Sequence, residues 1–510
     1  MTTTTTTHPA SSRPRASTPV TGDRNARRFA PRELATLALL LLLLAVAVRA
    51  PGFVVDTFNT DESLIATQAE VIRDGGDLYE EAVDRKPPLV PYVYAAAFTL
   101  LGTTGLWAAR LAAAVAVALA GVLLAIEARE RYGRRASWVA GVLLVLSTAA
   151  FVPQDGQAAN FEIFMLPGMV AAILLARRGR PAGAGVAVAA AALAKQTGAA
   201  ALLPVLYLVW RHGRKRGVTR ALVGFAVPLL LAALALGPSD LFFWTVLGNG
   251  DYVSIGSSGL LIALVAAAMT ALFVALQLPV LWTLPRAWRE RAQRRDTDLW
   301  LWVASGAVSI LVGLRFFGHY YLQLLPPLCL LTAGMLTRES PERVRRTLSL
   351  ALVVAAVCTA AGFVTQPFEK PRYETAAAYV ADRSAPTDRI LVWGHVPEIY
   401  HASGAKPATR FLTTRFLTGS WSGRAQKDVA VEDAGTPGAW DLFLGDFRSH
   451  PPRFILDAAP AKIRESEHYP ISIFPQLAAL VERDYRLVRH IDGIAVYERR
   501  PGAAFETLIW

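Results

Sequence analysis

Two adjacent carboxylates, Asp61 and Glu62, follow the first strongly apolar stretch of this sequence. A carboxylate at the edge of an apolar region can act as a general base toward a hydroxyl or an amine. Side chains at neighbouring positions of a helix diverge, so we do not expect these two to share a proton. The alternative is structural: Thr60 or Asp61 would cap a helix over ESLIATQAEVIRDG, and the local pattern alone favours this cap.

Several cations border the apolar stretches. Lys86 precedes two prolines, which keep the backbone extended and restrict where its ammonium can lie. Arg315, His319 and Tyr320 flank a later apolar segment, where arginine and aromatic side chains usually act as membrane anchors. Cations on the outer side of a membrane would also suit a phosphate group. Lys86 has the same two interpretations, because an interfacial lysine can extend toward lipid phosphates.

A further acidic group lies in the segment QDGQAANFE, residues 154–162. Glu162 stands at the mouth of an apolar segment, where a carboxylate is costly unless it is paired or hydrated. Lys195, at a polar interruption of a later apolar run, or Arg315 could be its partner. A structural ion pair and a catalytic role for Glu162 therefore remain equal alternatives.

The composition indicates what must position these groups. Hydrophobic residues make up 53% of the 510 residues and charged residues only 18%, whereas an average soluble domain has about 25% charged residues. Apolar runs such as 260–282 approach the roughly 20 residues that cross a bilayer core. The net charge of +12 is concentrated between these runs, which indicates orientation in a membrane and not nucleic-acid binding. Cys329 and Cys358 both fall in apolar runs, so neither a disulfide framework nor a thiolate metal site is expected.

The basic segments determine the expected topology, because positively charged loops are cytoplasmic. All of them must lie on one side, so one of the three apolar segments before the first basic loop cannot cross. Segment 87–102 is short and interrupted by Pro91, and we expect it to lie along the outer surface. The same rule divides 181–209 into two crossings that turn near Lys195. About eleven spans result: 34–50, 105–126, 136–153, 162–176, the two halves of 181–209, 220–237, 257–283, 299–314, 320–336 and 347–365.

The sequence predicts three parts. Residues 1–32 are rich in Thr, Ser, Pro and Arg, and we expect a disordered, basic cytoplasmic tail; a secretory signal is the less economical alternative. Residues 33–365 form the membrane part, with 51–104 as a first external loop that carries juxtamembrane helices. Residues 366–510 alternate helix and strand patterns and predict a small extracytoplasmic α/β domain. The α-helical, multi-pass chain is expected in the plasma membrane.

The run DESLIATQAEVIRDGGDLYEEAVDRKPPLV, with the AARL that follows it, resembles the first external loop of membrane glycosyltransferases with the GT-C fold. The group it is most similar to is the protein mannosyltransferase and lipid A aminoarabinose transferase type, often called glycosyltransferase family 39. In that family an Asp-Glu pair follows the first span, and a Lys-Pro-Pro or His-Pro-Pro follows an acidic loop. The segments ANFEIFMLPGMVAAILLARRG, AALAKQTGAAALLP and RFFGHYYLQLLPPL are also similar, and the resemblance covers most of residues 34–425.

The resemblance implies transfer of a sugar, with inversion, from a polyprenyl-phosphate donor to an acceptor outside the membrane, a cell-envelope glycan, lipid or protein. It implies Asp61 as the general base with Glu62 in support, and Glu162 as a residue that positions donor or acceptor. The candidates to neutralise or contact the departing phosphate are Lys86, Lys195, Arg315, His319 and Tyr320. No nucleotide is needed, a divalent metal is left open, and the C-terminal domain resembles those of bacterial relatives.

Two rival functions are weaker. A transporter or flippase of a lipid-linked sugar would more often bury ionisable groups near the bilayer midplane, whereas the candidates here lie at the outer ends of helices. A non-catalytic scaffold with an exported binding domain would tolerate loss of the Asp61 charge. No Ser-His-Asp order, phosphate loop, HExxH or GxGxxG pattern points to another enzyme class.

Overall fold

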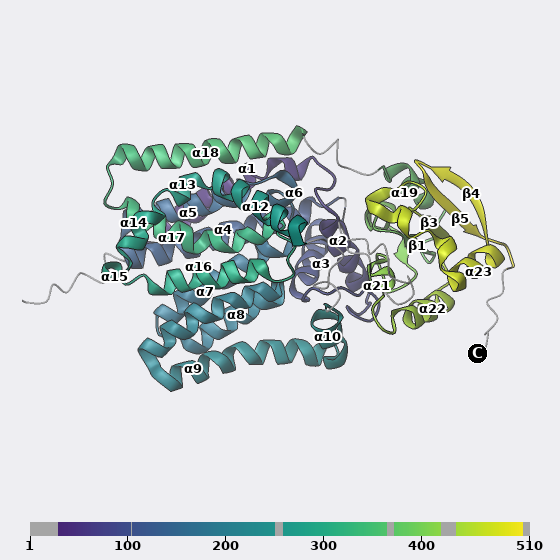
Figure 1. Cartoon of the computed structure of the whole chain (residues 1–510), viewed down its shortest axis with the longest axis horizontal. Helices are drawn as coiled ribbons and strands as arrows, with labels where there is room; N and C mark the ends of the chain where they lie inside the picture. The colour runs from purple at the N-terminus through teal and green to yellow at the C-terminus, as the bar shows by residue number, and fades with distance from the viewer. Residues whose placement is uncertain (1–28, 104, 250–258, 365–371, 420–434, 503–510) are drawn as a thin grey trace, which may run out of the picture.

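The computed structural model describes residues 29–103, 105–249, 259–364, 372–419 and 435–502. Nearly all of the predicted N-terminal tail lies outside these described residues, as do the end of the predicted outer loop at 250–258 and the predicted domain boundary at 365–371. The described chain forms a helical part and a smaller part that contains a β-sheet, and these two parts lie at opposite ends of Figure 1.

The helical part is built from long apolar helices joined by short helical turns. Its 3-10 turns are η1 Ala50–Phe53, η2 Gln196–Ala201, η3 Leu247–Asn249 and η4 Gly318–Leu324. Its α-helices are α1 Pro31–Ala47, α2 Thr60–Arg73, α3 Leu89–Leu101, α4 Trp107–Tyr132, α5 Arg134–Ala149, α6 Pro153–Gly156, α7 Phe161–Arg177, α8 Pro181–Ala194, α9 Leu202–Ala235, α10 Pro238–Thr245, α12 Gly259–Leu276, α13 Leu278–Leu281, α14 Leu284–Arg289, α15 Arg291–Arg294, α16 Thr297–Leu311, α17 Leu325–Leu336 and α18 Pro341–Val364.

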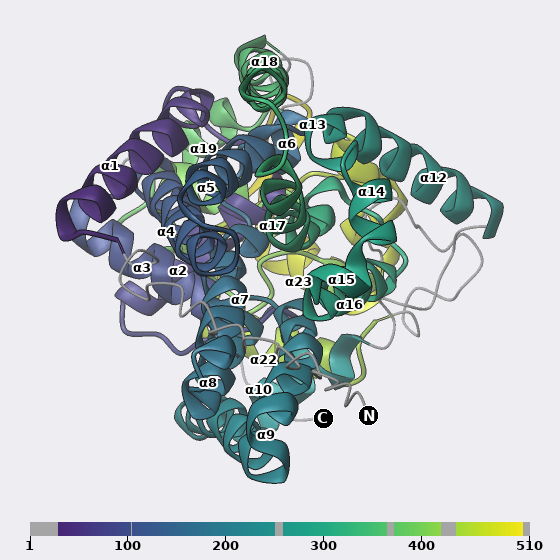
Figure 2. The ribbon, with the colours of Figure 1, turned by 90° about the vertical axis from the view of Figure 1, so that its left-hand side faces the viewer.

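The arrangement of these helices follows their composition. Figure 2 shows α4, α5, α7 and α17 inside a ring that includes α1, α9, α12 and α18. The inner helix α4 is rich in alanine, and small side chains let helices approach closely where lipid offers no hydrophobic driving force between them. The outer helix α12 is apolar on all sides and almost entirely exposed in the fold, as expected of a lipid-facing helix.

Four helical segments in the described residues are long and apolar enough to cross a membrane: Trp107–Tyr132, Gln196–Ala235, Gly259–Leu276 and Pro341–Val364. The other apolar helices are shorter, so the count of about eleven spans remains a prediction. The segment predicted to lie on the outer surface forms the short helix α3.

Two predicted interruptions of the apolar runs are present in the structure. Helix α9 changes direction at Arg214, in the basic loop that separates two predicted spans, where φ is 47°. Helix α8 ends at Ala194, and Lys195 adopts an extended backbone before η2 begins. Gly198 packs directly on the backbone of Ala191, and any side chain there would collide with it. This close approach places Lys195 at the end of α8.

Helix α2 does not begin with the N-cap that the sequence predicted as the structural alternative. The side chain of Asn59 caps the helix by accepting a hydrogen bond from the backbone N–H of Glu62 at 3.2 Å. The cap predicted at Thr60 or Asp61 is therefore wrong by one or two residues. Asn59 also donates to the backbone carbonyl of Gln154 at 2.8 Å and to Asn160 Oδ1 at 3.1 Å, which ties this cap to the next loop. The Asp61 side chain is thus not needed as a cap.

The C-terminal part is a mixed five-stranded sheet with helices around it (Figure 1). The strand order is β2-β1-β3-β5-β4, where β1 pairs in parallel with β2 and β3, and β5 pairs antiparallel with β3 and β4. Asp492 and Gly493 turn the β4–β5 hairpin with φ of 51° and 87°, as an Asp-Gly pair favours. The elements are α19 Glu374–Ala381, β1 Arg389–Trp393, α20 Glu398–Ser403, β2 Lys406–Pro407, α21 Arg415–Thr418, α22 Ala439–Ser449, β3 Phe454–Asp457, η6 Ile463–His468, η7 Ile471–Ile473, α23 Pro475–Asp484, β4 Tyr485–Ile491 and β5 Ile494–Arg499.

One hydrophobic core joins the C-terminal part to the external loop. Leu64 and Val71 of α2, and Val83 beyond it, belong to the same buried cluster as the strands of the sheet. Trp244 of α10 enters this cluster and packs edge-on against Phe416, with ring centroids 5.1 Å apart. The C-terminal part is therefore packed firmly onto the external loop and is not a freely hanging domain.

This shared core predicts the effect of removing Trp244. Trp244→Ala should reduce the stability of the C-terminal part by about 3–5 kcal/mol, because a large buried ring leaves a cavity. We expect a lower thermal midpoint and faster proteolysis between the two parts, measured on the protein in detergent. Phe242→Ala is the matched control, because Phe242 lies on the same helix with 54% of its surface exposed. Equal losses in both variants would contradict the shared core.

Candidate active site

Asp61 lies at the first turn of α2 and pairs with Lys86 from the far end of the external loop. Lys86 Nζ is 2.6 Å from Asp61 Oδ2, and the side chains are 10% and 23% exposed, respectively. Lys86 Nζ also lies 4.3 Å from the centroid of the Phe161 ring. Burial raises the pKa of Asp61, but the ammonium of Lys86 outweighs burial and holds this pKa well below its ordinary value. Asp61 is therefore an ionised carboxylate that substrate can reach.

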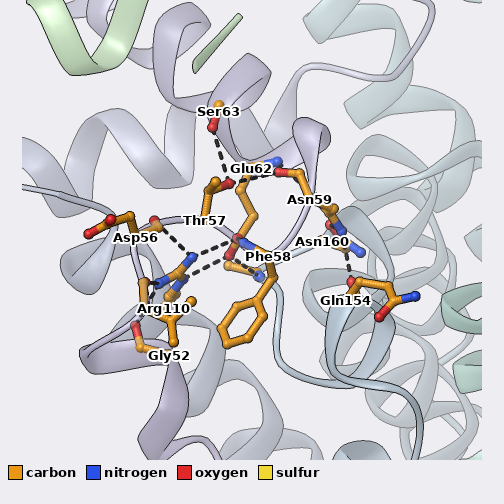
Figure 3. A network of polar contacts seen from close by, with 12 residues as sticks. Gly52, Asp56, Thr57, Phe58, Asn59, Glu62, Ser63, Arg110, Gln154 and Asn160 are labelled. Carbon is orange, nitrogen blue, oxygen red and sulfur yellow. Dashed lines mark hydrogen bonds and ion pairs between the residues drawn. The ribbon is translucent and has the colours of Figure 1, made fainter. Parts of the chain in front are cut away.

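Glu62 lies in a closed polar network with Arg110 (Figure 3). Its Oε1 accepts hydrogen bonds from Arg110 Nε at 2.9 Å and from the Ala159 backbone N–H at 2.8 Å. Its Oε2 accepts from Arg110 Nη2 at 2.7 Å and from the Phe58 backbone N–H at 3.0 Å. Glu62 is fully buried. These four donors indicate a structural residue, and its role in support of Asp61 is to hold the start of α2 in place.

A second set of charges comes from α7, α8 and η4. Glu162 Oε1 accepts a short hydrogen bond from Lys195 Nζ and lies 3.6 Å from His319 Nε2. His319 Nδ1 pairs with Asp155 Oδ1. Lys195 Nζ also lies 3.8 Å above the ring centroid of Tyr320. The sequence predicted two alternative partners for Glu162, and the structure pairs it with one of them, Lys195.

The protonation of His319 follows from its neighbours. Burial lowers the pKa of His319, but the carboxylates of Glu162 and Asp155 outweigh this effect and raise its pKa above the ordinary value. Gly318 makes this arrangement possible, because any side chain there would overlap the Phe151 ring and the Asp155 carboxylate. The sequence prediction of a cation at His319 therefore has a structural basis.

The two sets of charges are close to one another. The charge of Lys86 acts on the carboxylate of Glu162, and His319 is among the groups that lower the pKa of Asp61. Arg315 is buried four residues before His319, between Leu314 and Phe316, whose φ values of 52° and 53° are unusual for side chains of this size. The structure thus brings Lys86, Glu162, Lys195, His319 and Tyr320 into one neighbourhood with Asp61, and Arg315 lies beside it in the chain.

The C-terminal part contributes charges that the sequence predictions missed. The guanidinium of Arg415 lies close enough to Asp61 to lower the pKa of its carboxylate, and Asp61 in turn raises the pKa of the nearby His395. Arg410 of the same segment accepts a hydrogen bond at its backbone carbonyl from the Val83 backbone N–H at 2.9 Å. The tail segment AAAYVADRSAPTDRILVWGHVPEIYHASGAKPATRF, which contains His395, resembles the family, but no role was predicted for His395 or Arg415, because both approach Asp61 only through the packing of the two parts.

The sequence predictions also assigned no role to Arg110 and Asp155, although the sequence contained a signal for Arg110. An arginine near the start of an apolar segment is costly without a partner, and Arg110 stands in the AARL motif quoted above. Among the parts of the chain that the structure describes, no three His, Cys, Asp or Glu side chains gather as a metal site. The structure therefore designates no metal ligands.

The geometry can support a displacement that needs a base and a neutralised anionic leaving group. Asp61 is ionised and partly exposed, and the ammonium groups of Lys86 and Lys195 lie on the helical side of the site. Such charges act strongly where water is partly excluded.

Known proteins are similar to this chain in one sequence segment and in the whole fold. Residues 85–237 match the family model of dolichyl-phosphate-mannose-protein mannosyltransferases. No curated protein matches the chain significantly in sequence.

Solved structures resemble the chain over nearly its full length. ArnT from Cupriavidus metallidurans bound to undecaprenyl phosphate has a TM-score of 0.60 at 16% identity, covering 92% of this chain and 98% of that one. The apo state of ArnT gives the same TM-score and identity, with coverages of 91% and 98%. The Archaeoglobus fulgidus oligosaccharyltransferase in complex with Zn and sulfate has a TM-score of 0.52 at 13% identity, covering 91% of this chain and 73% of that chain.

These similarities confirm the fold that the sequence predicts. The chain has the GT-C fold, with a mostly helical membrane part and a small C-terminal sheet domain. The match of residues 85–237 to a mannosyltransferase family, together with this fold, indicates a membrane glycosyltransferase.

The two adjacent carboxylates should respond differently to loss of charge. Glu62→Gln should lower the stability by about 3–5 kcal/mol, because it leaves Arg110 buried without its counter-charge and an amide N–H₂ cannot accept a hydrogen bond. Asp61→Asn should cost only about 1 kcal/mol, because its side chain is partly exposed. The measurement is the thermal unfolding midpoint of both variants in detergent. A larger loss for Asp61→Asn would reverse our assignment of the structural and the reactive carboxylate.

Proposed function

We propose that this chain, with its GT-C fold, transfers a sugar from a polyprenyl-phosphate donor to an acceptor on the outer side of the membrane, with inversion at the anomeric carbon. The acceptor is a cell-envelope glycan, lipid or protein. The observation that carries the proposal is the pair of Asp61 with Lys86, which offers an ionised base beside a cation at one accessible site. The undecaprenyl phosphate bound to ArnT, which shares the fold, supports a lipid-phosphate donor.

Lys86 connects the two halves of the proposed reaction. In the substrate-free protein its ammonium neutralises Asp61, and this keeps the carboxylate a weak base. A donor phosphate that binds beside Lys86 competes with Asp61 for the ammonium. As Lys86 turns to the phosphate, the pKa of Asp61 rises and its carboxylate becomes a better proton acceptor. Donor binding thereby activates the base.

The proposed chemical step is a single displacement. Asp61 accepts the proton of the acceptor hydroxyl or amine as the new bond to the anomeric carbon forms. The bond between that carbon and the phosphate oxygen breaks at the same time, and its electron pair remains on the polyprenyl phosphate. Attack opposite to the leaving group inverts the anomeric carbon. The proton leaves the protonated Asp61 for solvent before the next turnover.

The second set of charges suits the leaving phosphate. Lys195 and His319 both contact Glu162, so their charges are partly neutralised before a phosphate arrives. An arriving phosphate shares the two cations with this carboxylate, and preorganised cations stabilise the charge that develops as the bond breaks. Glu162 then holds the two cations in place and positions the donor, with the Tyr320 ring beside Lys195.

The orientation follows the distribution of charge. We place the N-terminus in the cytoplasm, with the external loop and the C-terminal part outside, because the basic loops occupy one side of the predicted spans. The site then lies at the outer face of the cell membrane. A lipid-linked donor can reach it from the bilayer and a polar acceptor from the aqueous side.

The proposal predicts a loss of turnover on removal of the Asp61 charge. Asp61→Asn should lower kcat by about 10²–10⁴-fold, the usual contribution of a general base, with the fold intact. Purified protein in detergent is incubated with a panel of polyprenyl-phosphate sugars and candidate acceptors, and release of polyprenyl phosphate is measured.

Asp77→Asn is the control for Asp61→Asn, because Asp77 is an exposed carboxylate of the same external loop. It should retain wild-type turnover. If Asp61→Asn turns over normally, Asp61 is not the base. If the wild-type protein consumes no donor of the panel, the proposed function is wrong.

The pairing of Asp61 with Lys86 predicts a change in the pH profile. Lys86 lowers the pKa of Asp61 in the free protein, so Lys86→Met should raise it. Because the protonated carboxyl is inactive as a base, the acidic limb of kcat/KM should move to higher pH by about 1–3 units. Lys406→Met, which removes a lysine paired with the exposed Asp74, should leave the limb in place. An unchanged limb in Lys86→Met would separate the lysine from the base.

A further inference from the structure

The C-terminal sheet has an edge where ligands bind in other α/β folds. β1 and β3 are parallel neighbours, and the chain leaves β1 through α20 to reach β2 on the other side. The strand order therefore reverses between β1 and β3. In open α/β sheets, ligands bind in the crevice outside the carboxyl ends of the strands at such a reversal.

Cationic and polar side chains gather at this edge. His395 follows β1, and Arg464, Ser466 and Tyr469 follow β3. A small cavity of about 20 Å³ lies between them, completed by Thr414, Arg415, Gly394 and the exposed Glu465. This volume accommodates an oxygen-sized group and not a whole sugar. The backbone of Lys462, Arg464 and Glu465 is left-handed, with φ of 54°, 51° and 66°, and such conformations collect at ligand sites.

The hydrogen bonds assign the proton of His395. Its Nε2 accepts a short hydrogen bond from Arg415 Nη2, which requires an unprotonated Nε2. Burial lowers the pKa of His395 well below its ordinary value, with Arg415 and Arg464 adding to this effect, so the ring is neutral. The proton is then on Nδ1, which is buried and has no hydrogen-bond partner among the described residues. His395 therefore presents a hydrogen-bond donor without an acceptor.

The same edge faces the membrane part. The segment before Arg415 is joined to the external loop by the hydrogen bond between Val83 and Arg410, and Phe416 packs on Trp244. The guanidinium of Arg415 lowers the pKa of Asp61 across this junction, and the Asp61 carboxylate in turn acts on the pKa of His395. Arg464 is different, because it binds the buried Glu398 with Nη1 and Nη2 at 3.1 and 2.7 Å and is held rigidly.

We infer that His395 and Arg415, supported by Arg464, form an anion-binding site of the C-terminal part that holds a phosphate-type group of the acceptor over Asp61. This inference rests on the proposed function. The cations Lys86, Lys195 and His319 belong to the membrane part and serve the donor phosphate. An inverting displacement needs the acceptor on the opposite face of the anomeric carbon. A second anion site on the opposite part of the protein meets this need.

The chemistry of the site favours an oxygen anion. Arg415 supplies a charged guanidinium and His395 a neutral N–H, and both are donors to phosphate oxygens. The cavity admits one such oxygen, while the rest of the group remains outside it, nearer to Asp61. A neutral sugar acceptor would bring no anionic acceptor to the Nδ1–H of His395.

The test uses inorganic pyrophosphate as the probe and isothermal titration calorimetry of the full chain in detergent. Saturating undecaprenyl phosphate first occupies the cations of the membrane part. We expect wild-type protein to bind pyrophosphate under these conditions, and Arg415→Gln to weaken this binding about tenfold or more, as loss of a charge-assisted contact does. Arg415→Lys should recover part of the affinity. Arg486→Gln is the matched control, because Arg486 lies on β4 at the far edge of the sheet.

Three results would overturn the inference, and a fourth would support it. Absence of pyrophosphate binding to the wild-type protein, or equal binding by Arg415→Gln and wild type, overturns it. Weaker binding of undecaprenyl phosphate itself by Arg415→Gln also overturns it, because the site would then serve the donor. The double variant Arg464→Gln/Glu398→Gln removes the supporting pair without an uncompensated buried charge, and it should weaken pyrophosphate binding while keeping the wild-type thermal midpoint.

The two measurements distinguish a wrong anion site from a wrong proposed function. Pyrophosphate binding needs no turnover, so a missing anion site leaves the release of polyprenyl phosphate from a donor unaffected. A chain that consumes no donor of the panel but still binds pyrophosphate through Arg415 refutes the transferase and retains the site.

Discussion

The ion pair of Glu62 and Arg110 is the contact on which the rest of the site depends. Arg110 fixes η1 through the Gly52 carbonyl at 2.8 Å, and it fixes the start of α2 through Glu62. Glu62 in turn holds the backbone N–H of Ala159, just before α7. One buried pair thus joins three segments that are distant in sequence. A buried ion pair adds little net stability, but removing one of its partners is costly. The pair therefore matters chiefly because it holds these segments in one arrangement.

The charges around Asp61 show how the protein keeps a polar site next to lipid. Nearly every carboxylate near the site has a cation: Asp61 with Lys86, Glu162 with Lys195, and Asp155 with His319. Isolated charges would be strongly destabilising in such surroundings. In the proposed reaction each pair is balanced before the donor binds, and the donor phosphate takes a cation from a carboxylate, which then becomes more basic. This exchange allows binding and activation of the base to be one event.

The sequence predicted the general architecture well, because composition and charge alternation determine it. The break at Lys195, the polar end of α7 at Glu162 and the small α/β part all follow from local patterns. The partner of Glu62 did not follow, since Arg110 is 48 residues away in sequence, and neither did the Asn59 cap. Asp84 of the same external loop is buried, although a loop carboxylate usually lies in solvent.

The residues at His395 and Arg415 could not be predicted for a different reason. Their approach to Asp61 results from the packing of Trp244, Phe416 and Val83 in the shared core, which no local pattern encodes. A motif search reads short segments, and this junction is assembled from the external loop, α10 and the C-terminal part. Side chains from all three segments are needed to place His395 and Arg415.

The shared core also has a consequence for how the protein is made. The apolar side chains of α2 and the following loop emerge from the ribosome well before Tyr373, their partner in the same cluster. At the usual rate of synthesis, the roughly 290 intervening residues take about 15–60 s. During this time Leu64, Val71 and Val83 lack their partners from the C-terminal part. The newly made external loop therefore exposes these apolar side chains until the C-terminal part is made, and late truncations of the chain should yield an aggregation-prone product and not a smaller enzyme.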